Sequence, residues 1–208
     1  MVNTNPIDVV FFDIGGVLLT IHPDIMIKKI SNLTNIPYKT LKNSFPEEQH
    51  DLYERGEITD LEWFQAYKKS QPKLETLTEH EFWIAWSMLL GQETDVLDIL
   101  ISLKKYHKVW LLSNTNSRHI LNEVENNFIF PRLVDGKIYS FDVGSRKPEK
   151  KIYEVACEKA NVEPCRSIFI DDLELNIIGA NKIGMNGIHY INTNQLKNKL
   201  KTYRLNYE

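Results

Sequence analysis

The sequence has only two cysteines and no long apolar run. Cys157 and Cys165 lie eight residues apart with no His or Cys at metal-ligand spacing, which excludes a disulfide framework and argues against a zinc site. No stretch approaches the roughly 20 apolar residues of a membrane-spanning helix, and residues 1–6 lack the features of a signal peptide. We therefore expect a cytoplasmic protein without membrane contact.

An excess of charge of one sign is also missing. The 208 residues carry a net charge of −3, with 25% charged and 42% hydrophobic residues. A balance this close to neutral gives no field that would draw the chain to nucleic acid or to acidic membranes. The length suits one domain, or one core domain with a small insert.

Four short apolar runs stand out along the chain. They are rich in β-branched and aromatic residues and too short for helices, which predicts buried parallel strands at 9–12, 109–112, 168–170 and 188–191, with a weaker candidate at 139–142. Helical patterns with apolar stripes lie at about 95–105, 152–156 and 177–183, and Gly184 can end the last of them. Alternating strands and helices predict an α/β fold with a doubly wound parallel sheet, a Rossmann-like core.

Residues 20–92 show helical patterns but no convincing strand. Thr59–Glu62 and Thr78–Glu81 have the sequence of capping boxes, in which a Thr and the Glu three residues later satisfy the first N–H groups of a helix. We therefore expect an α/β core at 1–19 and 93–208, with an all-helical cap at 20–92 inserted into it. The aromatic residues that would fill the core of this cap are Tyr53, Trp63, Phe64, Tyr67, Phe82, Trp83 and Trp86.

Polar residues follow the predicted strands at the point where each strand ends. Asp13 follows the first strand, Ser113-Asn114 the second and Asp171-Asp172 the third. The carboxyl ends of parallel strands share one crevice, so these residues could meet there, and Lys147 could reach the same place after the weaker strand. Each residue alone has an ordinary explanation as a turn, capping or surface residue. The prediction depends on their order and their shared position.

Such a set of side chains suits phosphoryl transfer. Carboxylates with few neutral ligands bind a hard cation, and Mg²⁺ held by carboxylates and a substrate phosphate fits this set. A carboxylate such as Asp13 can also attack phosphorus to give an aspartyl-phosphate. Mg²⁺ and Lys147 would offset the repulsion between the anions, and Ser113 would donate to a phosphoryl oxygen.

Four ordered segments resemble the motifs of the haloacid dehalogenase-like superfamily. VVFFDIGGVL at 9–18 resembles the first motif, LLSNTN at 111–116 the second, RKPEKKIYE at 146–154 the third and FIDDLELNIIGANKIGM at 169–185 the fourth. The helical insert lies where this family has a small cap domain. Within the family, the segments look most similar to a branch of small sugar-phosphate phosphatases.

This resemblance implies a Mg²⁺-dependent phosphatase with a phosphoaspartyl intermediate on Asp13. The substrate would be a small phosphorylated metabolite, which the branch suggests is a sugar phosphate. Its phosphate would be bound by Ser113, Asn114 and Lys147. The metal ligands would be the Asp13 side chain, the Gly15 backbone carbonyl and Asp172, with Asp171 assisting directly or through water, and Asn176 would orient Asp172 or a water molecule.

Gly15 departs from the family pattern. Most phosphatases of the family carry a second Asp at this position, which contacts the metal through its backbone and protonates the leaving group with its side chain. Three alternatives stay open for this reason. The chain could be a metal-independent haloacid dehalogenase, or a non-catalytic member that binds a phosphorylated ligand or a protein partner. It could also be a phosphatase in which His22 or His119 supplies the proton.

The cap would decide which substrate is accepted, because its residues reach over the crevice. A closed helical cap favours a small substrate over a protein or a nucleic acid. The segment 53–57 and Trp63 are the candidates for substrate contact, although a place on the helix surface or in the cap core is the preferred explanation for any one of these residues.

Overall fold

The computed structural model describes residues 6–205. The expectation that residues 1–6 form no signal peptide therefore concerns a segment that lies almost wholly outside the described residues. Within the described part of the chain, no helix is both long enough and apolar enough to span a bilayer.

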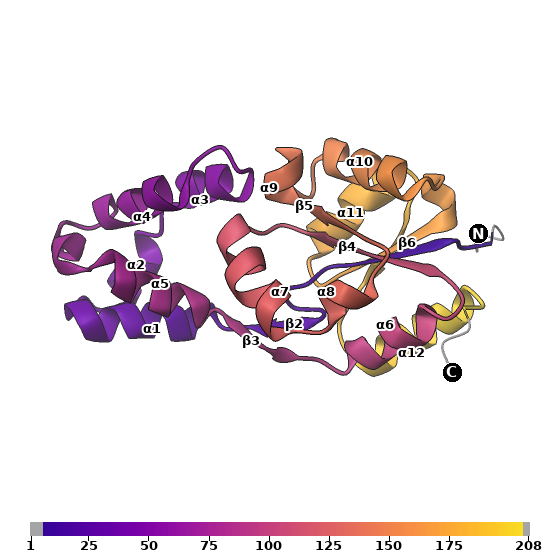
Figure 1. Cartoon of the computed structure of the whole chain (residues 1–208), viewed down its shortest axis with the longest axis horizontal. Coiled ribbons are helices and arrows are strands. Elements are labelled where there is room, and N and C mark those ends of the chain that lie inside the picture. The colour runs from indigo at the N-terminus through magenta and orange to yellow at the C-terminus, as the bar shows by residue number, and fades with distance from the viewer. Residues whose placement is uncertain (1–5, 206–208) are drawn as a thin grey trace.

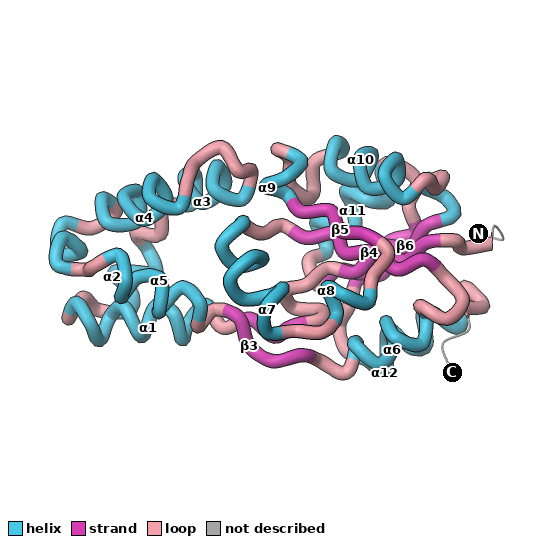
Figure 2. Tube along the Cα trace, in the orientation of Figure 1, coloured by secondary structure: helices cyan, strands magenta, loops and turns pink. Residues whose placement is uncertain are grey.

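The core is a five-stranded parallel sheet with the strand order β5-β4-β1-β6-β7 (Figure 2). The first strand of the chain is therefore the central one. Strands β4 and β5 lie on one side of it and β6 and β7 on the other, which confirms the predicted doubly wound sheet. The strands are β1 (Val9–Phe12), β4 (Lys108–Ser113), β5 (Gly136–Tyr139), β6 (Ser167–Asp171) and β7 (Asn186–His189).

Helices cover both faces of the sheet (Figure 1). Val10 and Phe12 of β1 pack in the cluster that includes α6 (Val96–Leu103) and α12 (Thr193–Thr202). Val9 and Phe11 point the other way, toward α10 (Lys150–Ala160) and α11 (Glu174–Lys182). Because successive strand residues face opposite sides, a strand buried on both faces must be apolar throughout, as the VVFF run is. The short connecting elements are η2 (His119–Val124), α7 (Glu125–Asn127), α8 (Phe130–Leu133), α9 (Ser140–Val143) and η3 (Pro164–Arg166).

A separate group of helices forms the cap, which lies at the end of the molecule away from the termini (Figure 1). Its own apolar core contains all the aromatic residues expected there, and both predicted capping boxes are present at Thr59 and Thr78. The helices are α1 (Pro23–Thr34), α2 (Tyr38–Asn43), α3 (Glu47–Glu54), α4 (Asp60–Lys69), η1 (Pro72–Thr76) and α5 (Glu79–Ser87).

Two short strands join the cap to the core, where the sequence suggested none. β2 (Leu19–Ile21) and β3 (Leu90–Glu93) pair antiparallel, so the chain leaves and re-enters the core side by side. These strands have three and four residues and are largely exposed, so they carry almost no apolar pattern for the sequence to reveal. The predicted domain boundaries at 19/20 and 92/93 fall inside these two paired strands and stay a prediction.

The prediction of a strand at 139–142 is wrong in its position. The strand is β5, which ends at Tyr139, and Ser140–Val143 form the helical turn α9. The Ser140 hydroxyl donates to the Thr115 carbonyl and accepts from the Thr115 N–H, which ends the extended segment. Gly144, with a φ of 63°, then reverses the chain. Strand β7 likewise lies two residues earlier than predicted.

The fold makes a prediction about the cap core. Trp63 is fully buried there, with its ring 5.6 Å from Tyr53 and 5.3 Å from Trp86. Replacing Trp63 by Ala should lower the free energy of unfolding by about 3–5 kcal/mol, because it leaves a large cavity. Leu61→Ala on the same helix, at a side chain 51% exposed, should change it by less than about 0.5 kcal/mol. Chemical denaturation followed by circular dichroism measures both, and equal effects would contradict this account of the cap.

Candidate active site

The strand register brings the predicted polar residues to one edge of the sheet. Phe12 of β1 is level with Leu111 of β4 and Ile170 of β6. Asp13 and Asp171 therefore stand one residue beyond this level, and Ser113 stands two. All of these lie at the carboxyl ends of parallel strands, as the sequence predicted.

Lys147 lies at the centre of this group. Its Nζ is 3.0 Å from Asp13 Oδ2 and 2.6 Å from Asp171 Oδ2, and it also donates to the Leu112 carbonyl at 3.1 Å. The side chain is only 1% exposed. A buried cation of this kind is stable only when its charge is paired, and here two carboxylates share it.

Burial and charge shift the pKa values of these groups. Burial raises the pKa of Asp13 to about 7; the nearby Lys147 opposes this rise and Asp171 adds to it. Burial alone would lower the pKa of Lys147, but the charges of Asp13 and Asp171 outweigh it and raise this pKa. Burial, and then the charge of Asp171, raise the pKa of Asp172. The site therefore carries more negative charge than one lysine can compensate.

Ser113 and Asn114 differ in what their side chains do. Ser113 is buried next to Asp13, and a hydrogen bond from its hydroxyl to the Asp13 carboxylate acts to lower the pKa of that group. The hydroxyl also makes a long contact, 3.4 Å, to the Asn114 carbonyl. The Asn114 amide accepts from the Lys147 N–H at 2.8 Å and donates to the Lys147 carbonyl at 2.9 Å. Asn114 thus fixes the backbone of Lys147, and its second amide N–H is left for a further acceptor.

The fourth motif is arranged differently from the expectation for Asn176. The Asn176 side-chain nitrogen donates to both carboxylate oxygens of Asp171, at 3.0 Å each, and not to Asp172. Asp171 also accepts from the Leu173 N–H and from Lys147, and it is fully buried. Asp171 is therefore held as a charge partner of Lys147. Asp172 is half-buried and lines the cavity, which leaves its carboxylate for a metal ion.

The donor set fits a divalent cation with oxygen ligands. Carboxylate oxygens of Asp13, Asp171 and Asp172 all lie within 4.8 Å of one another. Gly16, next to Gly15, has a φ of 77°, and a Cβ at this position would lie 2.3 Å from Asp172 Oδ2. Only glycine lets the backbone pass so close to this carboxylate. Three carboxylates supply hard oxygen ligands, which suit Mg²⁺.

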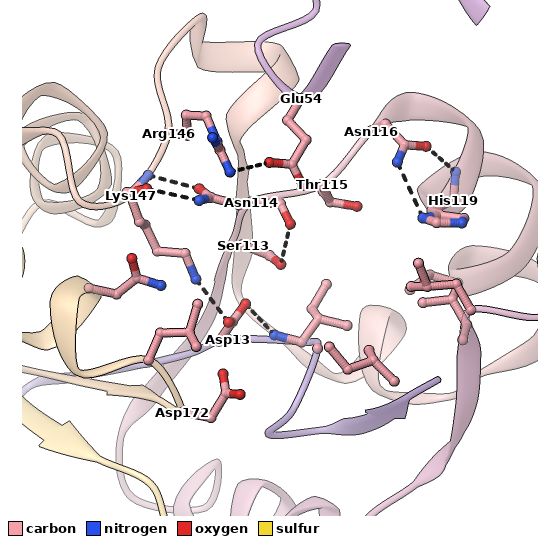
Figure 3. Close-up of a pocket in the computed structure, with 18 of the residues that line it drawn as sticks. Asp13, Glu54, Ser113, Asn114, Thr115, Asn116, His119, Arg146, Lys147 and Asp172 are labelled. Atoms are coloured by element: carbon pink, nitrogen blue, oxygen red, sulfur yellow. Dashed lines mark hydrogen bonds and ion pairs between the residues drawn. The ribbon is translucent and has the colours of Figure 1, made fainter. Parts of the chain in front are cut away.

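A cavity of about 280 Å³ opens above these groups (Figure 3). Glu54 and Arg146 lie on its cap side, across from Asp13 and Asp172 (Figure 3). The cap closes the cavity, which makes it suitable for a small ligand. Its lining includes Asp13, Gly15, Ser113, Lys147, Asp172 and Asn176 from the core, and His50, Glu54, Trp86 and Leu89 from the cap side.

Comparison with known proteins agrees with this geometry. The model of the haloacid dehalogenase-like hydrolases matches residues 7–184. The chain belongs to this family. It is 27% identical to a sesquiterpene phosphatase from Aspergillus oryzae, over 86% of this chain and 87% of the relative. It is 26% identical to a D-ribitol-5-phosphate phosphatase from Bacteroides thetaiotaomicron, over 84% and 87%.

A solved structure of the same family has a similar fold. It is a haloacid dehalogenase family enzyme from Bacteroides thetaiotaomicron in complex with magnesium and inorganic phosphate. The TM-score is 0.76 at 25% identity, and the match covers 88% of this chain and 93% of that one. The family and the fold class that the four motifs predicted are thereby confirmed.

Neither histidine suggested as a substitute acid is placed for that role in this family member. His22 lies at the start of α1 with its Nε2 3.2 Å from Thr20 Oγ1, and it does not line the cavity. His119 does line it, but its two ring nitrogens are 3.2 Å from the Asn116 amide nitrogen and from the Trp86 carbonyl. Burial lowers the pKa of His119 to about 4. His119 is thus a neutral packing residue.

Three polar cavity residues were not singled out from the sequence. His50 lay outside every candidate segment, Arg146 was quoted only as the start of the third motif segment, and Glu54 only as part of the segment 53–57. Trp63, the other candidate for substrate contact, is buried in the cap core instead. Nothing in the pattern distinguishes Glu54 from other charged residues of a surface helix. Arg146 could have been noticed, because it directly precedes the motif lysine.

The raised pKa of Asp13 predicts how metal binding depends on pH. Mg²⁺ needs the ionised carboxylate, and below a pKa of about 7 a proton competes for it. The affinity for Mg²⁺ should therefore level off above pH 7 and fall about tenfold for each unit below it. Isothermal titration between pH 5.5 and 8.5 measures this. Asp13→Asn should bind more weakly and lose the dependence near pH 7; an affinity that stays constant from pH 6 to 8 in the wild type would contradict the prediction.

Proposed function

We propose that this protein is a Mg²⁺-dependent phosphatase that hydrolyses a small phosphorylated metabolite, a sugar phosphate, through an aspartyl-phosphate on Asp13. One observation carries the proposal. The Asp13 carboxylate faces a closed cavity with Ser113 beside it and the buried Lys147 ammonium 3.0 Å away. A nucleophile, a hydroxyl donor and a cation are thus assembled around one space of suitable size.

The first step transfers the phosphoryl group to the protein. An Asp13 carboxylate oxygen attacks phosphorus, and the bond from phosphorus to the substrate oxygen breaks. Lys147 and Ser113 donate to phosphoryl oxygens, whose charge they stabilise in the transition state. Two residues keep Lys147 in place for this role. Asn114 holds the backbone of Lys147, and Asp171 holds its ammonium group.

The second step releases phosphate. A water molecule attacks the phosphorus of the aspartyl-phosphate, the bond to the Asp13 oxygen breaks, and the nucleophile is regenerated. The cofactor is Mg²⁺, which when bound by Asp13, Asp172 and the Gly15 carbonyl neutralises charge on the phosphoryl group. The acidic cluster fits it, and a similar enzyme was solved with magnesium and phosphate.

The alternative activities fit the site less well. A metal-independent dehalogenase has no need for Asp172 in the cavity, where burial and Asp171 already raise its pKa. Such a carboxylate is costly without a cation. A non-catalytic phosphate-binding member would not require the buried nucleophile, the lysine and the metal acids together. These residues are all present and placed for chemistry.

The test of the proposed function is a phosphatase assay with p-nitrophenyl phosphate and a panel of phosphorylated metabolites. Activity should be lost in excess chelator and restored by Mg²⁺, with Ca²⁺ poor because it prefers more ligands. Asp13→Asn, which is nearly isosteric, should keep the fold and lose turnover. Full activity in excess chelator would contradict the metal role, and substantial turnover by Asp13→Asn would exclude the covalent mechanism.

Gly15 leads to a prediction about leaving groups. Without an acid at this position, alkyl phosphates should react more slowly than aryl or acyl phosphates, whose leaving oxygens need no proton. Gly15→Asp should raise turnover of alkyl phosphates, by up to about 10²–10⁴-fold. An added Cβ at this position meets one methyl group, Ile21 Cγ2, at 3.2 Å, and Ile21 is exposed and has room to adjust.

Gly15→Asn is the matched control, because it has the same shape and no proton to give. Rates are measured as kcat and kcat/KM for one alkyl, one aryl and one acyl phosphate. A wild type without leaving-group dependence, or an Asn variant as active as the Asp variant, would show that the proton is supplied from elsewhere.

A further inference from the structure

A carboxylate from the cap lines the cavity, and the mechanism above does not use it. Glu54 ends helix α3 and is only 9% exposed, yet it belongs to the cavity lining on the side opposite Asp13 (Figure 3). An ionised group is costly to bury unless its oxygens are paired. Its position in a substrate-sized space therefore needs a reason.

The two oxygens of Glu54 are not equally engaged. Oε2 lies 2.6 Å from Arg146 Nη2, within ion-pair distance. Oε1 lies 4.0 Å from His50 Nε2, which is beyond hydrogen-bond distance. One oxygen is thus held by an arginine, and the other can accept a hydrogen bond from a ligand.

Docking of the cap does not explain Glu54, because other residues already serve that purpose. Asp51 of the same helix pairs with Arg146 and Arg55, and Arg55 donates to Glu149 of the core at 3.0 Å. Asp51 does not line the cavity and is about one-third exposed. Asp51 is therefore a docking residue only, whereas Glu54 both pairs with Arg146 and faces the ligand space.

The position of Glu54 is also fixed relative to the reacting groups. Arg146 directly precedes Lys147, whose backbone carbonyl accepts a hydrogen bond from the Asn114 amide and whose N–H donates one to it. Ionic contact with Arg146 thus places the Glu54 carboxylate at a set position relative to Lys147 and Ser113. A substrate whose phosphate lies against Asp13 and Lys147 would direct its organic part toward Glu54.

The residues that line the cavity indicate which kind of organic group on the substrate would fit. Trp86, Leu89 and Leu90 are apolar and can contact any carbon skeleton. Glu54 discriminates, because a hydroxyl can donate to Oε1, whereas a hydrocarbon would bury that oxygen without a donor. Sites built to hydrogen-bond a hydroxyl reject analogues that lack it far more strongly than apolar pockets reject a missing methylene.

We propose that Glu54 is a specificity-determining residue that accepts a hydrogen bond from a substrate hydroxyl, so that the substrate is a phosphorylated polyol or sugar and not the phosphate of an apolar alcohol. This inference rests on the proposed phosphatase function and adds the residue that selects the substrate class.

The test uses pairs of phosphate esters of similar size, one rich in hydroxyl groups and the other with a hydrocarbon in their place. Three pairs serve: ribitol 5-phosphate with pentyl phosphate, glucose 6-phosphate with cyclohexylmethyl phosphate, and glucose 1-phosphate with cyclohexyl phosphate. With Mg²⁺, wild-type kcat/KM should favour the hydroxylated member of the best pair by at least about 100-fold. Glu54→Met should lower kcat/KM for that member by about 10- to 100-fold, mainly through KM, and leave its apolar partner unchanged or improved.

Asp51→Asn is the matched control, since it removes an ion pair of the same helix with Arg146 outside the cavity. It should affect both members of a pair equally. Should Glu54→Met fail to fold by circular dichroism, Glu54→Gln, which keeps an acceptor without the charge, should lose part of the preference. No preference in any pair, or equal losses for both members on changing Glu54, would overturn the inference. A wild type inactive on p-nitrophenyl phosphate with Mg²⁺ would instead overturn the proposed function beneath it.

Discussion

The contact of one buried ammonium group with two carboxylates determines how the rest of the site can be built. Two like charges about 4 Å apart repel by about 4 kcal/mol at the effective dielectric of a protein. Lys147 stands between Asp13 and Asp171 and makes their proximity possible. Asp172 adds a third carboxylate that Lys147 does not neutralise, which leaves a place for a metal ion and, with it, a phosphate.

The short segment around Lys147 also connects the core to the cap. Arg146 contacts Asp51 and Glu54 of the cap, and Glu149 contacts Arg55. Residues on either side of the lysine thus determine where helix α3 rests, while Asn114 holds the lysine itself. The cap surface over the cavity therefore rests on the same segment that holds Lys147. The position of helix α3 is thus linked to the position of the reacting groups.

Sequence reasoning found most of the core site but not the cap side of the cavity. β1 and β6 were predictable because strands buried on both faces must be apolar throughout, and Asp13, Ser113 and Asp171 followed from the strand ends. The antiparallel pair of β2 and β3 was missed because exposed strands of three or four residues lack an apolar pattern. The partner of Asn176 could not be known either, since a choice between Asp171 and Asp172 depends on side-chain direction.

In the proposed mechanism, Asp13 forms a covalent bond to phosphorus, and Lys147 and Ser113 bind the transferred group. A crystal structure of the wild-type protein grown with Mg²⁺ and beryllium fluoride tests it most directly, because beryllium trifluoride mimics an acyl phosphate. We expect it bonded to an Asp13 carboxylate oxygen, with Lys147 and Ser113 on its fluorine atoms and the metal on Asp13 and Asp172. A catalytically active protein whose Asp13 stays unmodified, with the fluoride bound elsewhere, would contradict the account.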